Sequence, residues 1–194
     1  MLAHPTRKAV NDMTIKLADI EKLFRDHGHI AYSGEGVTQL EHALQCAKLA
    51  EDEGASDELV TAAFLHDLGH LLNLQGESPT ERGIDDQHQY FAIPFIRALF
   101  PPAIVDAIRL HVDAKRALCA LEPEYYEALS EDSRRSLTLQ GGIFTRQEMQ
   151  AFMAKPFAEN ALRVRRWDDR AKVAGATTPG IGHYLQIASR CAAA

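Results

Sequence analysis

A histidine and an aspartate stand side by side, as His66-Asp67, at the end of the apolar run Ala62–Leu65. The run is predicted to be helical, so packing alone would favour Leu or Val at both positions. A charged side chain is rarely buried without a partner, because removing it from water is costly. A cation bound by both side chains would remove that cost. The pair therefore predicts a metal site inside the fold.

The composition is that of an ordinary globular protein. The chain has 194 residues, 46% hydrophobic and 25% charged, which is enough to bury a substantial core in one domain. The net charge of −6 argues against nucleic acid or an acidic membrane as a partner. We expect a single domain over residues 1–194, in which residues 1–30 form a peripheral N-terminal helix.

A cytoplasmic location is expected. Residues 1–5 begin no long apolar run, so the sequence predicts neither a signal peptide nor a membrane span. Cys46, Cys119 and Cys191 are odd in number and lack CxxC spacing, which is typical of reduced thiols.

The hydrophobic pattern predicts an all-α fold. Capping boxes start helices at Thr38 and Thr145, and Pro102 suits the first turn of another. Pro94 should kink or split the helix expected over 87–100. Residues 73–86 are polar and predict a loop. The remaining helices are expected over 12–26, from Ser56 through the His66-Asp67 pair, in short pieces over 122–140, over 156–172, and after Pro179.

Four predicted helices each carry a histidine on or near an apolar face: His42, His66, His88 and His111. Any one of them alone fits a hydrogen-bonded core residue. Four that meet in one core fit a metal site better, since helical proteins build two-metal sites from inward-projecting imidazoles and carboxylates. His66 and His70 also imitate the zinc-protease pattern His-Glu-x-x-His. Aspartate is too short to act well as its general base, so we set that interpretation aside.

A family resemblance rests on a series of motifs in a fixed order. The motifs are Tyr32-Ser-Gly-Glu35, Gln39-Leu-Glu-His42, His66-Asp-x-Gly-His70, His111-Val-x-Ala-Lys115-Arg116, Leu129-Ser-Glu-x-Ser133, Gln140-Gly-Gly and Trp167-Asp168-x-x-Ala-Lys172. With them the chain resembles the HD-domain mixed-valent di-iron oxygenases that cleave carbon–phosphorus bonds, over residues 31–190. The resemblance implies an HD-domain helical bundle with a di-metal site in its core.

The resemblance also implies the metal ligands. One iron would be held by His42, His66, Asp67 and Asp168, and a second by His88 and His111 with Asp67 as the bridge. Asp169 is a possible substitute for Asp168, although the position after Trp167 is the one that matches. The resemblance implies an Fe(II)/Fe(III) pair with O2 as co-substrate. Nitrogen and oxygen ligands also suit zinc or manganese, so the ligand types leave the metal open.

The predicted substrate is a small phosphonate, which brings negative charge into an acidic protein. Its contacts are expected from Tyr32, Glu35, His70, Lys115, Ser133, Gln140, Arg165 and Lys172, and the resemblance gives catalytic roles to Asp67, His70 and Tyr32. In that family the tyrosine guards an iron site and the glutamate meets the substrate amine. Glu35 therefore favours a substrate that carries an ammonium group. Asp85, Asp86, Tyr90 and Phe91 flank His88, and which of them face inward stays open.

The expected reaction is oxidative cleavage of a 1-hydroxy-2-aminoethylphosphonate, as the primary amine or the N-trimethyl form. It would give phosphate with glycine or glycine betaine in phosphonate catabolism, after a 2-oxoglutarate-dependent hydroxylase. The main alternative is an HD-domain hydrolase of phosphomonoesters or nucleotides. A regulatory module without activity is disfavoured because the whole ligand set is present.

Overall fold

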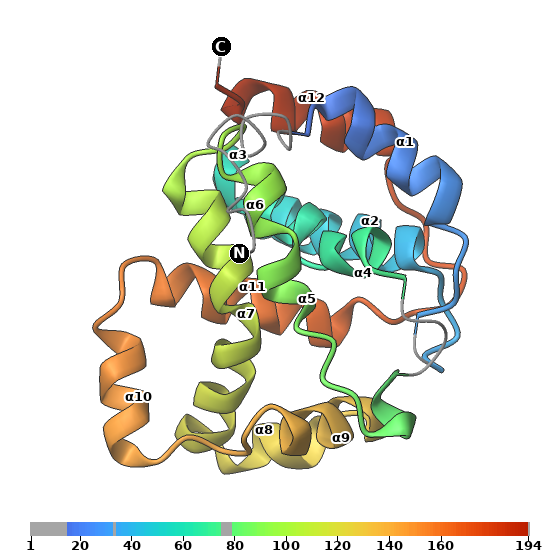
Figure 1. Cartoon of the computed structure of the whole chain (residues 1–194). Coiled ribbons are helices and arrows are strands. Elements are labelled where there is room, and N and C mark those ends of the chain that lie inside the picture. The colour runs from blue at the N-terminus through green and yellow to red at the C-terminus, as the bar shows by residue number, and fades with distance from the viewer. Residues whose placement is uncertain (1–14, 33, 75–78, 194) are drawn as a thin grey trace, which may run out of the picture.

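The computed structural model describes residues 15–32, 34–74 and 79–193 and is built from helices (Figure 1). They are α1 (Leu17–His27), α2 (Gln39–Asp52), α3 (Asp57–Leu65), α4 (Leu68–Leu72), the 3-10 helix η1 (Pro79–Arg82), α5 (His88–Phe91), α6 (Ile93–Ile96), α7 (Pro102–Leu121), α8 (Pro123–Ala128), α9 (Glu131–Leu139), α10 (Arg146–Met153), α11 (Ala158–Arg170) and α12 (Ile181–Cys191). Within the described residues, β structure is limited to one isolated bridge between Ala31 and Thr38. The predicted all-α fold is confirmed.

Local signals start the helices where they were expected. Thr38 caps α2: its hydroxyl accepts a hydrogen bond from the Glu41 amide at 3.2 Å. In return the Glu41 carboxylate accepts a hydrogen bond from the Thr38 amide at 2.7 Å. Thr145 begins α10 in the same way, and Pro102 occupies the first position of α7. The helix expected over 87–100 is split into α5 and α6 just before Pro94, whose ring cannot continue an α-helix.

The main core lies where α3 packs against α2, α7 and α12. Phe64 of α3 stacks on Phe24 and Tyr184, with ring centroids 5.0 and 5.8 Å apart. A second buried cluster joins the C-terminal half of α7 to α10 and α11, and α11 crosses the centre of the molecule beside α7 (Figure 1). Ile20 and Phe24 place α1 in the main core. Residues 1–14 of the expected N-terminal helix lie outside the described residues.

The predicted helix through His66-Asp67 is wrong at this pair. α3 ends at Leu65 and α4 begins at Leu68, with Asp67 at φ −100° and ψ 12°. The His66 Nδ1 atom lies 2.9 Å from the Ala63 carbonyl oxygen, which is the acceptor that the Asp67 amide would use in a continuous helix. Asp67 lies at this break, and its side chain is buried.

The predicted helix over 156–172 is shorter than expected. Phe157 adopts a left-handed backbone (φ 61°), α11 starts at Ala158, and Lys172 lies beyond its end at Arg170. Side chains of α2 hold the segment that follows. The Gln45 amide exchanges two hydrogen bonds of 3.0 Å with the Val173 backbone.

Gly69 sets how closely α4 approaches α5. A Cβ atom at this position would lie 2.0 Å from the His88 carbonyl oxygen and 2.9 Å from its Cα. Contacts so short require the backbone to move. The glycine therefore allows His88 to reach the centre of the fold.

We expect Gly69→Ala to destabilise the protein by about 1–3 kcal/mol, because the methyl group overpacks the α4–α5 contact. Gly182→Ala is the matched control: a Cβ there meets nothing within 4 Å, and alanine should stabilise α12 by up to about 1 kcal/mol. Urea unfolding of both variants measures the difference. Equal stability of the two variants would contradict the close approach at Gly69.

Candidate metal centre and anion pocket

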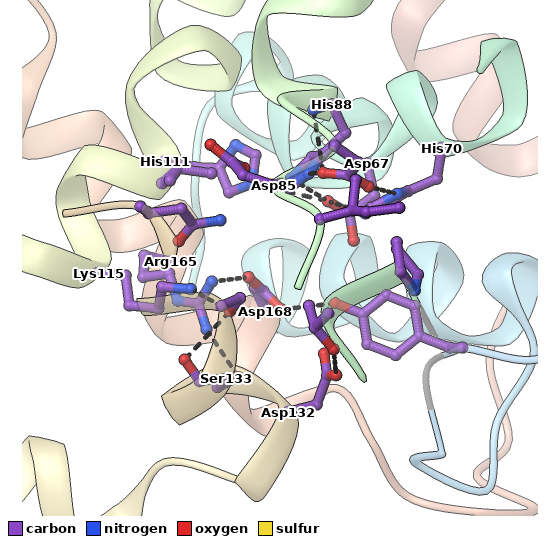
Figure 2. Close-up of a pocket in the computed structure, with 18 of the residues that line it drawn as sticks. Asp67, His70, Asp85, His88, His111, Lys115, Asp132, Ser133, Arg165 and Asp168 are labelled. Carbon is purple, nitrogen blue, oxygen red and sulfur yellow. Dashed lines mark hydrogen bonds and ion pairs between the residues drawn. The ribbon is translucent and has the colours of Figure 1, made fainter. Parts of the chain in front are cut away.

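Six buried side chains from five segments of the chain meet at the centre of the fold. They are His42 of α2, His66 and Asp67 between α3 and α4, His88 at the start of α5, His111 of α7 and Asp168 of α11. Figure 2 shows Asp67, His88 and His111 close together, with Asp168 farther toward Arg165 and Lys115. All six residues were predicted as metal ligands, and the fold brings them together.

The carboxylate of Asp67 lies between two pairs of imidazoles. Its Oδ2 atom is 3.5 Å from His42 Nε2 and 3.2 Å from His66 Nε2. Its Oδ1 atom is 3.3 Å from His88 Nε2 and 3.6 Å from His111 Nε2. The donor atoms therefore form two groups that share one carboxylate.

Asp168, and not Asp169, faces the first group. Its Oδ1 atom lies 3.4 Å from His42 Nε2, and its Oδ2 atom lies 3.9 Å from His66 Nε2. Asp169 accepts hydrogen bonds from Tyr125 and Arg165 instead. One turn of α11 thus places neighbouring carboxylates in different environments.

The hydrogen bonds of the imidazoles test whether a metal fits. His42 and His66 each direct Nδ1 at a backbone carbonyl 2.9 Å away. A carbonyl only accepts, so Nδ1 carries the proton and Nε2 offers a lone pair. These two Nε2 atoms are 3.3 Å apart, and those of His88 and His111 are 3.0 Å apart. Lone pairs at such distances repel unless a cation lies between them.

The unpaired oxygen of Asp67 supports the same conclusion. Its Oδ2 atom is buried and has no hydrogen-bond partner among the described residues, although a buried carboxylate oxygen without a donor is costly. A metal ion would satisfy this oxygen and the facing imidazole nitrogens together. The residues present therefore fit a metal centre.

The pKa shifts show that positive charge is favoured around Asp67, at the centre of the cage that the six side chains form. Burial alone would raise the pKa of Asp67, yet His66 and His70 lower it well below its usual value. Burial alone would lower the pKa of His88, but the Asp86 and Asp67 carboxylates raise it to about 10. Protons or a metal ion can supply that charge, and only a metal leaves the Nε2 lone pairs free to act as ligands.

A pocket opens beside the cage, and three cations line it. Lys115 of α7 donates to the Ser136 hydroxyl at 2.6 Å. Arg165 of α11 pairs with Asp168 at 2.7 Å and also with Asp169. Lys172 pairs with Glu35 at 3.1 Å. The pocket thus has a cationic wall close to the candidate ligands (Figure 2).

Lys115 is the most deeply buried of these cations. Burial, and then the neighbouring Arg165 guanidinium, lower its pKa to about 7. No carboxylate pairs with it in the described part of the chain. An anion that enters the pocket would therefore find a lysine without a competing counter-ion.

Tyr32 covers the first donor group. Its ring stacks on His42, with centroids 3.9 Å apart, and its hydroxyl lies 3.4 Å from Asp168 Oδ1. Burial, and then the Asp168 carboxylate, raise the pKa of this phenol well above its usual value, so it is neutral. Glu35 lies in an adjacent groove and reaches the pocket through its pair with Lys172.

The remaining predicted contacts also lie at the pocket. Ser133, Gln140 and His70 line it, and Ser133 Oγ is 3.4 Å from both Arg165 Nη2 and Lys172 Nζ. The buried Gln140 Oε1 atom has no hydrogen-bond partner among the described residues. The sequence left the orientation of the residues around His88 open, and the structure settles it. Asp85 and Asp86 line the pocket, whereas Tyr90 and Phe91 are 46% and 41% exposed and lie outside its lining.

Sequence reasoning missed the residues that hold the site residues in place. The Ser136 hydroxyl accepts a hydrogen bond from Lys115. Tyr125 and Asp169 accept hydrogen bonds from the Nε–H group of Arg165. The sequence carried no signal for Ser136 or Tyr125, because both come from separate helices and make their contacts only in the folded chain.

Comparisons with known proteins agree with this geometry. The HD domain family model matches residues 39–141, more than half of the chain. A hydroxymethylphosphonate dioxygenase of Gimesia maris is 40% identical over 177 residues, or 91% of this chain and 88% of the relative. A glycine-betaine-forming [1-hydroxy-2-(trimethylamino)ethyl]phosphonate dioxygenase of Leisingera caerulea is 38% identical over 168 residues, 87% and 86% of the two chains.

The chain belongs to the HD-domain family. The predicted HD-domain bundle and the resemblance to the phosphonate oxygenases of that family are thus confirmed. A protein of Acanthamoeba polyphaga mimivirus without an assigned function, L432, is 34% identical over 170 residues, 87% of this chain and 78% of its own. Along the described ranges of this HD-domain protein, none of the helices combines the length and apolarity needed to cross a membrane.

We expect Asp67→Ala to abolish metal binding by this HD-domain protein, because the carboxylate faces both donor groups. Asp52→Ala is the control, since Asp52 is exposed and, among the described residues, forms its ion pair with Lys48. Metal analysis of protein purified without chelators measures the loss, and circular dichroism checks that both variants fold. A variant that keeps its full metal content would contradict the shared role of Asp67.

Proposed function

We propose that this HD-domain protein uses O2 and two iron ions to cleave the carbon–phosphorus bond of a 1-hydroxy-2-aminoethylphosphonate, as the primary amine or the N-trimethyl form. The products would be phosphate and glycine or glycine betaine. One observation carries the proposal: two pairs of imidazoles share Asp67, and this carboxylate lines a cationic pocket together with the second pair, His88 and His111. The two relatives named as phosphonate dioxygenases, about nine-tenths of whose length this chain covers, support it.

The ligand set supports two ions. His42, His66 and Asp168 would hold one and His88 and His111 the other, with the two oxygens of Asp67 between them. Such a set of imidazoles and carboxylates suits iron. When bound, the iron pair supplies a Lewis acid for the substrate hydroxyl and the electrons that activate dioxygen.

The cationic wall would bind the phosphonate. Two carboxylates already neutralise Arg165, and Glu35 neutralises Lys172. Lys115 pairs only with a hydroxyl in the described structure. We therefore assign Lys115 the largest share of the binding charge, with Arg165 and Ser133 fixing the orientation of the phosphonate oxygens.

The Glu35–Lys172 pair suggests how the substrate amine is bound. A phosphonate at Lys172 would replace Glu35 as its counter-ion. The Glu35 carboxylate, which would otherwise lose its partner in a half-buried position, then accepts the substrate ammonium. A substrate with a phosphonate at one end and an ammonium group at the other would pair with both Lys172 and Glu35. Neither side chain would then lose its counter-ion. A substrate without the amine would not complete this exchange.

The pocket lining favours the primary amine. A quaternary ammonium prefers aromatic faces, and among the described lining residues only Tyr32 offers a phenyl-type ring. One face of that ring stacks on His42. The carboxylates of Asp85 and Asp132 also line the pocket. They can accept hydrogen bonds from the N–H groups of a primary ammonium, whereas a trimethylated nitrogen has none to donate.

The substrate hydroxyl must come from an earlier reaction. We propose that this protein acts after a 2-oxoglutarate-dependent hydroxylase that oxidises the carbon next to phosphorus. The alternative, a hydrolase of phosphomonoesters or nucleotides, gains no support from the named relatives.

We expect oxygen-dependent phosphate release from 1-hydroxy-2-aminoethylphosphonate, with less from its N-trimethyl analogue and least from hydroxymethylphosphonate. The physical reason is that only the first substrate both exchanges partners with Glu35 and Lys172 and donates to carboxylates. The measurement is oxygen uptake together with phosphate release by iron-loaded protein. Phosphate release without oxygen uptake would favour the hydrolase and overturn the proposal.

We expect phosphonate binding at pH 8 to take up about one proton at Lys115. Its pKa near 7 leaves the amine mostly neutral at pH 8, and a bound anion would raise that pKa and recharge the amine. At pH 6 the amine is already charged, so the uptake should vanish. Calorimetry in buffers of different ionisation enthalpy measures the protons, under anaerobic conditions that prevent turnover.

Lys115→Arg is the matched control, because arginine keeps the positive charge and does not titrate in this range. The difference in proton uptake between the two proteins removes the contribution of the phosphonate itself. Equal uptake at pH 8 would mean that Lys115 is charged before the anion binds.

A further inference from the structure

Asp86 joins two imidazoles with different tasks. Its Oδ1 atom lies 2.8 Å from His88 Nδ1, and its Oδ2 atom lies 2.7 Å from His70 Nδ1. The two rings stack with centroids 4.0 Å apart. One carboxylate therefore anchors both a candidate metal ligand and a residue that lines the substrate pocket.

This anchor distinguishes His88 from the other imidazoles of the cage. His42, His66 and His111 direct Nδ1 at the carbonyl oxygens of Ala171, Ala63 and Ile108. His88 alone among the four has a carboxylate there. A carboxylate behind a ligating histidine fixes its ring and increases its basicity more than a neutral carbonyl does. The donor group of His88 and His111 is thus the one with an added negative charge behind it.

The same contact determines which nitrogen of each ring is free. An ionised carboxylate only accepts hydrogen bonds, so both Nδ1 atoms must donate. The Nε2 atom of His88 then points at Asp67 Oδ1, 3.3 Å away, and that of His70 lies 3.8 Å from the same oxygen. Both rings therefore present a nitrogen to the same oxygen of Asp67.

We propose that Asp86 is a positioning residue that holds His88 as a ligand of the second metal ion and His70 in the orientation that faces substrate. The inference rests on the proposed function, and it deepens that function by linking the second metal to the substrate pocket. Asp86 also accepts the His88 amide at 3.3 Å, so the start of α5 and the ligand it carries share one anchor.

The test removes the carboxylate and counts ions. The iron-loaded Asp86→Ala protein should lose its second ion at about 10–100-fold lower EDTA concentration than the unmodified protein, since supporting carboxylates contribute about that much to metal affinity. It should keep its first ion, whose imidazoles have separate anchors. Asp85→Ala is the matched control, because Asp85 lines the same pocket and pairs with neither ring in the described contacts.

Two results would overturn the inference. One is an Asp86→Ala protein that keeps both ions at the EDTA concentrations of the control. The other is loss of both ions together, which indicates a general folding role. The proposed function is tested separately: an unmodified protein that holds two ions but fails to oxidise phosphonates refutes that function and leaves the role of Asp86 standing.

A second measurement needs no variant. In the zinc-loaded protein, nitrogen-15 spectra of the histidine rings report which nitrogen of His70 carries the proton. We expect a proton on Nδ1, as donation to Asp86 requires. A proton on Nε2 alone would show that the carboxylate does not hold His70, and it would overturn the inference even if Asp86→Ala did not fold.

Discussion

The structure depends on one buried carboxylate surrounded by imidazoles. Asp67 has an oxygen toward each of two histidine pairs, and a carboxylate in that position is unfavourable unless positive charge accompanies it. The surrounding helices place imidazole nitrogens where a positive charge next to Asp67 would bind. Each Nδ1 atom is bound behind its ring, so each Nε2 atom faces the centre.

Local structure yields to this requirement around the His66-Asp67 pair. The helix breaks there, and the His66 ring lies against the carbonyl of Ala63 in its last turn. Gly69 then allows the chain at His88 to pass within van der Waals distance. Neither feature benefits helix stability, and both position candidate metal ligands. Such conflicts between local preference and global arrangement are expected where a fold carries a site.

Several charged side chains around the centre pair with groups of opposite charge. Arg165 lies between Asp168 and Asp169, Lys172 pairs with Glu35, and Asp86 stands behind His88. Among the described residues Lys115 differs, because its partner is the Ser136 hydroxyl, and burial lowers its pKa to about 7. The pocket therefore has one amine without a carboxylate partner among the described residues. An anionic group bound there would serve as its partner, which agrees with a phosphonate substrate.

The sequence by itself was enough to predict the fold class and the candidate ligands. The helical periodicity, the capping boxes and the order of the histidine and aspartate motifs predicted the all-α HD-domain fold, because these signals are local or follow the chain. The six candidate ligands were also named in advance. The residue types and the helical pattern singled out the four histidines and Asp67, the family resemblance added Asp168, and their roles stay predictions.

Only the tertiary structure decided how these side chains are used. It turned Asp168 rather than Asp169 toward the histidines, excluded Tyr90 and Phe91 from the pocket, and placed Asp86 behind two rings. Such outcomes depend on the rotation of each helix and on contacts between residues far apart in the chain. Helical spacing alone leaves that rotation undefined until the helices pack.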